Sequence, residues 1–322
     1  MKFKHTLQIL IDNFSVTYKQ LLYRLLITLL TFGLSFAILY PIGKMFTGLP
    51  EIRSLWDSIK AFFSKLIEGD IDELREINIR DKVEVALDSV SALIKSHTTV
   101  IALGIVGIIA IRFISMFFSS LGNFAAAAVI NDKMALRAES PFTITLLRNL
   151  KSASLYSIMY VPLSFLYDVT CVTLMYFVVF KLLIFMPLLL QIFLFVTAIV
   201  FAITVKLTFA SDWLPAIIRG KKKPLEAFAY TFSRKNKRTF NVLSNFVILV
   251  LIIFAFNVFA IIFTFGVGAL ITIPASYVVL NCFQLVNYYD REELKYFLDK
   301  KTIIKPEKEE TITREQFFKG DE

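Results

Sequence analysis

Residues 212–240, DWLPAIIRGKKKPLEAFAYTFSRKNKRTF, lie between two long apolar runs of the sequence. The stretch holds eight basic residues against two acids, Asp212 and Glu226. Between its two basic groups, apolar side chains recur at helical spacing, at Leu225, Phe228, Ala229 and Phe232. An apolar face rimmed by cations between two membrane runs is typical of a helix in the plane of the cytoplasmic lipid surface. We call such a segment an elbow, and the sequence predicts this one over residues 222–238.

The composition is that of a membrane protein. Of the 322 residues, 57% are hydrophobic and 19% are charged, and the mean hydropathy is +0.67. Soluble domains are about 25% charged. The apolar residues form long uncharged runs, which predicts an all-α polytopic membrane protein. The net charge of +9 could indicate nucleic-acid binding. Most of the excess flanks apolar runs, however, so membrane topology explains it better and we expect no nucleic-acid partner.

The apolar runs predict six transmembrane helices, since about 20 residues cross the hydrocarbon core. Residues 239–289 carry no charge but are too many for one span. Gly266 and Gly268 divide them into a hairpin of the fifth and sixth spans. The first four spans are predicted, in chain order, within residues 25–43, 96–131, 152–178 and 183–210.

The distribution of Lys and Arg predicts the topology. Basic residues are concentrated before the first span, in the two elbow loops and in the tail, so both termini are expected to be cytoplasmic. The chain then divides into four parts. These are a cytoplasmic amphipathic lead-in with the first span (1–43), an external amphipathic helical insert (44–97), a five-span membrane domain (98–289) and a charged cytoplasmic tail that begins with a short helix and is largely disordered (290–322).

The insert is the most acidic polar segment. Residues 44–95 hold eight basic and ten acidic residues, and their apolar positions recur at helical spacing. The segment GDID, which begins at Gly69, is expected to break the insert into two amphipathic helices. They could lie on the lipid surface or cap the bundle, and the sequence leaves this open.

A second, weaker elbow is predicted at residues 138–151, which include PFTITLLRNL (141–150). Pro141 and Pro224 align at an offset of 83 residues (224 − 141), and each lies between a span and an amphipathic helix. The pattern predicts repeated helix–elbow–helix units. Convergence under the same membrane constraints is an alternative explanation.

The basic residues of the 212–240 stretch are candidates for binding anionic lipid headgroups on the cytoplasmic side, because each basic residue near an anionic surface contributes about 1 kcal/mol. Other membrane proteins are further candidate partners. The eight cations are Arg219, Lys221, Lys222, Lys223, Arg234, Lys235, Lys237 and Arg238.

Two ionisable residues within spans are candidates for an intramembrane ion pair. Arg112 shares a helical face with small residues of the second span, and Asp168 shares one with serines of the third. The two lie at one depth only if the second span ends near residue 128. A structural pair or a snorkelling Arg112 is one interpretation, and a substrate or ion pathway is the other. Lys206, near the end of the fourth span, is expected to snorkel.

The 212–240 stretch resembles a group of bacterial six-span membrane proteins that includes the YciC-like family and the membrane domain of some glycerophosphodiester phosphodiesterases. In that group a P-A-[IV]-[IV] start, a basic turn and an amphipathic elbow precede a span. The resemblance covers roughly residues 100–290. It implies the fold and a bacterial plasma-membrane location, and it carries no catalytic residues.

No enzyme motif is found: the sequence has no G-x-S-x-G, no H-E-x-x-H and no phosphate loop, and His5 and His97 lack metal-ligand spacing. We therefore expect no enzymatic activity, no metal and no cofactor. Two functions remain. The first is a non-enzymatic accessory, assembly or lipid-organising component of the membrane. The alternative is a small-solute or lipid transporter with a polar path near Arg112 and Asp168.

Overall fold

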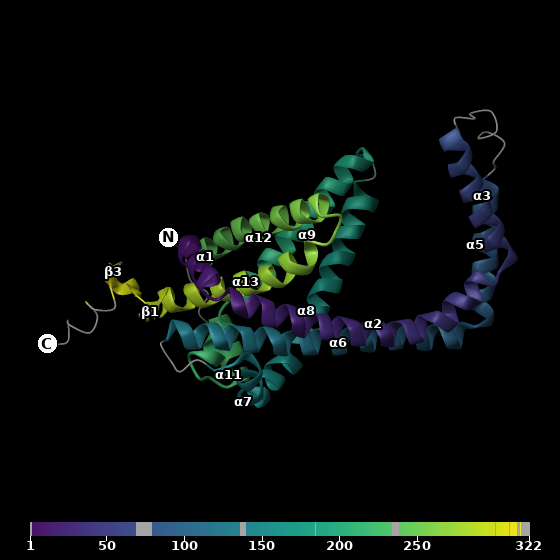
Figure 1. The fold of residues 1–322 in the computed structure, drawn as a ribbon. Coiled ribbons are helices and arrows are strands. Elements are labelled where there is room, and N and C mark those ends of the chain that lie inside the picture. Colours follow the sequence, from purple (N-terminus) through teal and green to yellow (C-terminus); the bar gives the residue numbers. More distant parts are fainter. Residues whose placement is uncertain are drawn as a thin grey trace. The chain divides into compact units, whose positions relative to one another are not determined.

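The computed structural model describes residues 2–68, 79–135, 140–183, 185–233, 238–299, 301–308, 310–313 and 316. The chain forms two compact units, each described by itself below. Unit 1 comprises residues 1–27 and 116–322, and unit 2 comprises residues 28–115. Figure 1 shows the helices and strands in chain order.

Six helices in the described residues are long and apolar enough to cross a membrane, as the sequence predicted. Gly266, between the last two, has a φ of 92°, which residues with a side chain rarely adopt. The predicted break at this position is confirmed. The six helices are α2 (Phe14–Thr47), α6 (Thr98–Met134), α8 (Leu150–Tyr176), which continues as the π-helix η1 (Phe177–Leu182), α9 (Leu188–Ala210), α12 (Arg238–Phe263) and α13 (Ala269–Arg291).

Two of these helices end inside protein rather than in lipid. Helix α6 has 37 residues, and its length of about 55 Å exceeds the roughly 30 Å of hydrocarbon. Every residue from 124 to 132 of α6 and from 281 to 289 of α13 is buried. A helix that is buried all round must be surrounded by other elements. These turns form the centre of unit 1.

Short helices surround that centre. Helix α1 (Lys2–Asp12) packs along α13, and α10 (Trp213–Ile218) continues from α9. The predicted elbows contain the helices α7 (Phe142–Arg148) and α11 (Pro224–Ser233). On α11, Ala227 is buried and Phe228 packs against the core, whereas Leu225 is exposed. The core cluster that joins these elements to α6 and α8 includes Phe124, Tyr156, Trp213 and Tyr288.

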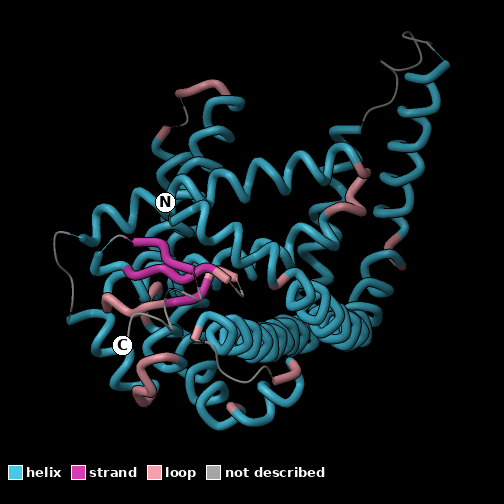
Figure 2. Tube along the Cα trace, turned by 60° about the vertical axis from the view of Figure 1, so that its left-hand side comes forward, coloured by secondary structure: helices cyan, strands magenta, loops and turns pink. Residues whose placement is uncertain are grey.

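The tail differs from the prediction of a short helix and a disordered segment. Within residues 296–313, the described part forms an antiparallel sheet of β1 (Tyr296–Phe297), β2 (Thr302–Lys305) and β3 (Glu310–Thr313), drawn in magenta in Figure 2. Asp299 Oδ1 accepts hydrogen bonds from the backbone N–H groups of Lys301 and Thr302, both at 2.7 Å, and so fixes the first turn. The β-branched residues of β2 and β3 favour strands, and Ile303 and Ile304 are buried.

The sheet contacts the start of the chain. His5 Nδ1 lies 2.9 Å from the hydroxyl of Tyr296, and Lys2 Nζ lies 3.2 Å from Asp290 Oδ2 at the end of α13. Tyr296 is buried in a cluster that also contains Ile9 of α1. The sheet therefore contacts both α1 and the end of α13.

Unit 2 contains helices α3 (Pro50–Glu68) and α5 (Ile79–Ser96), together with adjoining parts of α2 and α6. Helices α3 and α5 pack against each other, and Lys82 Nζ donates to Ser58 Oγ at 2.6 Å. The sequence predicted two helices here. The predicted break around Gly69 lies outside the described residues.

Candidate anion-binding site

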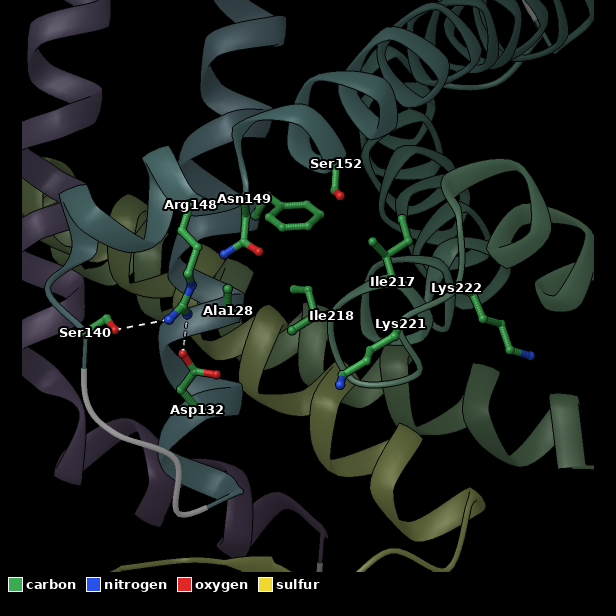
Figure 3. Close-up of a pocket in the computed structure, with 11 residues that line it drawn as sticks. Ala128, Asp132, Ser140, Arg148, Asn149, Ser152, Ile217, Ile218, Lys221 and Lys222 are labelled. Atoms are coloured by element: carbon green, nitrogen blue, oxygen red, sulfur yellow. Dashed lines mark hydrogen bonds and ion pairs between the residues drawn. The ribbon is translucent and has the colours of Figure 1, made fainter.

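A cavity of about 490 Å³ lies within unit 1, between the end of α6, the α7 elbow and the loop that joins α10 to α11 (Figure 3). Its lining combines cationic and polar side chains with the apolar faces of α6 and α10. The lining residues are Phe124, Ala128, Asp132, Ser140, Arg148, Asn149, Ser152, Ile217, Ile218, Lys221 and Lys222.

Arg148 forms one wall of the cavity. Its Nη2 donates to Asp132 Oδ2 at 2.7 Å, and its Nη1 donates to Ser140 Oγ at 3.2 Å, as the dashed lines in Figure 3 show. Asp132 is buried near the end of α6, so the ion pair fixes the last turn of α7 against α6. A guanidinium held by two partners is pre-oriented for further hydrogen bonds.

The α10–α11 loop supplies the other two cations. Lys221 has a φ of 51°, in the left-handed region that non-glycine residues rarely adopt. Lys222 donates its backbone N–H to Ala216 O at 3.2 Å, and its Nζ lies 3.1 Å from the ring centroid of Tyr230. In Figure 3, Lys221 extends toward the side on which Asp132 lies, and Lys222 extends the opposite way.

A glycine is required just before these lysines. A Cβ at Gly220 would lie 2.6 Å from Ala216 O and 2.8 Å from the Tyr288 hydroxyl. The loop can therefore pass close to α13 only with glycine at this position. The close packing of the turn at Gly220 therefore fixes the backbone positions of Lys221 and Lys222.

The DWLP segment (212–215), which precedes the elbow, is fixed by a second ion pair. Arg291 Nη1, at the end of α13, contacts Oδ2 of the buried Asp212. Trp213 Nε1 donates to Pro224 O at 2.9 Å, which joins the start of α10 to the start of α11. Tyr230 donates to Glu292 Oε1 at 2.6 Å. These contacts hold both ends of the basic loop against α13.

The cavity has a surplus of positive charge. Two cations, Arg148 and Lys221, line it with one carboxylate, Asp132, which gives a net charge of +1 (2 − 1), and Lys222 lines it with a side chain that extends the opposite way. Ser140, Asn149 and Ser152 add hydroxyl and amide donors. A concave site of this charge attracts anions, and its donors suit phosphate oxygens.

The remaining predicted cations do not line the cavity. Lys223 is 84% exposed, and its Nζ lies 4.0 Å from Glu226 Oε1. Arg219 Cζ lies 5.3 Å from the ring centroid of Tyr289. Arg234, Lys235 and Lys237 lie outside the described residues, and Arg238 begins α12 with a side chain that is not described.

The two candidate intramembrane residues lie in different units. Asp168 has a partner within unit 1, since Lys206 Nζ lies 2.6 Å and 2.8 Å from its two carboxylate oxygens. Arg112 belongs to unit 2, where it is exposed and forms no ion pair with a described residue. The pairing of Arg112 with Asp168 stays a prediction. Lys206 was expected to snorkel, and the structure places its ammonium on Asp168 and Ser164 instead.

Sequence reasoning passed over four residues that position the site. Asp132 and Asp212 each follow a long apolar run, and each pairs with an arginine: Arg148 in the first case and Arg291 in the second. The sequence does contain a signal for each of these ion pairs: an acidic residue at the end of an apolar run, with an arginine further along the chain. It specifies no partner, because Asp212 and Arg291 are 79 positions apart.

Comparisons of the chain with protein families, with curated proteins and with solved structures find no match. The resemblance of residues 100–290 to YciC-like proteins therefore stays a prediction. Among the described residues, no group of three or more His, Cys, Asp or Glu side chains is placed to hold a metal ion.

Proposed function

We propose that this chain is a non-enzymatic accessory, assembly or lipid-organising component of a bacterial plasma membrane, and that it binds anionic lipid headgroups at its cytoplasmic face. Its six apolar helices indicate an integral membrane protein. The observation that carries the finer proposal is the cavity between the two elbows, with Arg148, Lys221 and Lys222 in its lining.

The dimensions and chemistry of the cavity support this proposal. Its volume of about 490 Å³ lies within the range of roughly 300–1,000 Å³ typical of ligand sites. Both elbows contribute to it, and the positive-inside pattern predicts that elbows lie at the cytoplasmic lipid surface. A headgroup phosphate placed there would meet Lys221 and the exposed edge of Arg148. Each such contact near an anionic surface contributes about 1 kcal/mol.

The test compares lipid binding by pocket and surface lysines. The full-length protein is reconstituted in nanodiscs of phosphatidylcholine, with or without phosphatidylglycerol, and its thermal unfolding is followed. We expect phosphatidylglycerol to stabilise the native protein and the Lys223→Gln control. The Lys221→Gln/Lys222→Gln double variant should lose most of that stabilisation. Equal stabilisation of all three proteins would contradict the proposal.

A second candidate function, transport of a small solute or lipid, is favoured by the Lys206–Asp168 pair, because charged residues within spans often mark transport paths. Water should then reach Ser164, which hydrogen-bonds with Lys206 at 3.3 Å. With Cys171 and Cys282 replaced by Ala, Ser164→Cys should react with a membrane-impermeant thiol reagent. Leu163→Cys, on the exposed apolar face of α8, is the matched control. Equal labelling of both would contradict a path.

A further inference from the structure

Arg24 is held among neutral groups from three helices of unit 1. Its Nη2 donates to Asn123 Oδ1 of α6 at 2.9 Å, and Gln20 Nε2 donates to the same oxygen at 2.5 Å. The guanidinium carbon lies 3.5 Å from the ring centroid of Tyr277 on α13. The position and plane of the guanidinium are therefore fixed by a hydrogen bond and a stacked ring.

The charge of Arg24 is not balanced locally. In the part of the chain that the structure describes, no carboxylate forms an ion pair with it, and its buried Nε has no hydrogen-bond partner. Gln20 is 0% exposed, and its Oε1 likewise has no partner among the described residues. A half-buried guanidinium whose Nε lacks an acceptor costs free energy unless a further hydrogen-bond acceptor accompanies it.

Further polar residues, on α8 and α9, continue the polar group that begins at Arg24. Tyr160 of α8 lies near Tyr277 and Lys206, and Lys206 hydrogen-bonds with Ser164 at 3.3 Å. Asp168 balances the charge of Lys206, so the group as a whole keeps the one positive charge of Arg24. None of these residues lines the cavity between the elbows.

We infer that unit 1 holds a second anion-binding site, in which Arg24 binds a carboxylate or phosphate group beside Asn123 and Tyr277. Planar guanidinium groups bind both anions through paired N–H donors, and the buried Nε supplies a donor that needs an acceptor. Tyr277, whose ring stacks on the guanidinium, is 37% exposed, so this group lies near the surface of the bundle. The group could belong to a lipid or to a small soluble anion.

Trp213 provides a reporter for the test. Its ring centroid lies 6.0 Å from that of Tyr160, and the only other tryptophan, Trp56, belongs to α3. In full-length Trp56→Phe protein, purified in detergent, Trp213 fluorescence is recorded during titration with sodium phosphate or sodium acetate. Sodium chloride at matched ionic strength is the reference. We expect a saturable change that the Arg24→Gln variant shows only at roughly tenfold or higher concentration, because a charge-assisted hydrogen bond is lost.

Two further variants separate this site from the elbow cavity and from misfolding. Lys221→Gln/Lys222→Gln should keep the anion response. Asn123→Asp places a carboxylate beside Arg24, so it should abolish the response while raising the unfolding temperature, even if Arg24→Gln does not fold. The inference is overturned if the parent protein gives no saturable response, if Asn123→Asp responds as the parent does, or if the response depends on Lys221 and Lys222 instead of Arg24. The last result would leave the proposed headgroup site intact.

Nanodiscs identify the source of the anion. A response to free phosphate in phosphatidylcholine nanodiscs that phosphatidylglycerol leaves unchanged assigns a soluble anion. An Arg24-dependent response to phosphatidylglycerol alone assigns a lipid headgroup. The absence of any Arg24-dependent response in either membrane contradicts the site.

Discussion

The ammonium group of Lys206 contacts both carboxylate oxygens of Asp168, at 2.6 Å and 2.8 Å, and so joins α9 to α8 between two spans. Lys206 also hydrogen-bonds with Ser164, one turn before Asp168. The side chains of Lys206 and Asp168 are 20% and 43% exposed, so the pair lies at the edge of the helix contact. It neutralises two charges that would each be costly alone within a span.

Removing one partner of this pair should destabilise the fold. Lys206→Met or Asp168→Asn should each lower the free energy of unfolding by roughly 2–3 kcal/mol, because the other charge then lacks its counterion. The double variant should recover much of the loss. Unfolding in a denaturing detergent, followed for the two single variants and the double, measures the coupling. Additive losses would mean that the pair contributes nothing beyond its separate side chains.

Arg112 serves as the comparison in the same experiment. A second cycle with Arg112→Gln and Asp168→Asn tests the pair predicted from the sequence. We expect near-additive effects, because Asp168 already has Lys206. A coupling as large as that of Lys206 and Asp168 would show that Arg112 shares the carboxylate.

The spans could be predicted because about 20 apolar residues determine a membrane helix, whatever their partners are. The break at Gly266 and the elbow helices around Phe142 and Leu225 followed from local signals in the same way. Pairings could not be predicted. Lys206 and Asp168 are 38 positions apart, and their contact depends on the rotation and depth of two helices, which apolar composition leaves undetermined.

The tail shows a second reason why the structure could not be fully predicted from the sequence. Its charge and few apolar residues indicated disorder, but Ile303 and Ile304 are buried and Tyr296 belongs to the core. Two β-branched apolar residues between charges were too few for a strand prediction. They form a strand because α1 and α13 offer an apolar surface, a tertiary effect that local propensity does not contain.

Arg291 should be essential for the position of the elbow. Arg291→Gln removes the cation that contacts buried Asp212 and should cost about 3–5 kcal/mol, the range for breaking a buried ion pair from one side. Tyr230→Phe removes only the hydrogen bond to Glu292 and should cost about 1 kcal/mol. Trp213, next to Asp212, reports both by fluorescence during unfolding. Equal effects of the two variants would contradict a special role for the ion pair.

The contact between α1 and the tail sheet should depend on pH. Burial lowers the pKa of His5 below its ordinary 6.5, and the N-terminal amine and Lys4 act in the same direction against Asp290. Between the lowered pKa and 6.5, the unfolded chain binds more protons than the folded one. Stability from His5 is therefore present above pH 6.5 and is lost as the pH falls through that window.

The two histidines of the chain, His5 and His97, allow a matched test of this pH dependence. Unfolding temperatures measured at pH 7.5 and pH 5.5 should differ less for His5→Gln than for the native protein. His97→Gln, at an exposed position, should leave the difference unchanged. An unchanged difference in His5→Gln would show that other groups produce the pH dependence.

The predicted topology can be tested with reporter fusions. Fusions at Glu139, Lys222 and Asp321 should report a cytoplasmic position, because basic residues cluster around the first two and in the tail. A fusion at Gly69, in the net-acidic insert, should report an external one. A cytoplasmic signal at Gly69 would contradict both the six-span topology and the placement of the elbow cavity at the inner surface.

A substitution at Lys221 can separate the effect of its backbone conformation from the effect of its charge. Its φ of 51° costs a residue with a side chain roughly 1–2 kcal/mol, whereas glycine adopts this conformation freely. Lys221→Gly should therefore fold at least as stably as the native protein in phosphatidylcholine. It should nevertheless lose part of the added stability that phosphatidylglycerol confers, because a cation that lines the cavity is gone. Lys223→Gly is the control, since Lys223 is exposed and outside the cavity. If Lys221→Gly destabilised the protein in both lipids, the side chain of Lys221 would be needed for packing of the loop. The left-handed backbone conformation of Lys221 would then have no connection with anion binding.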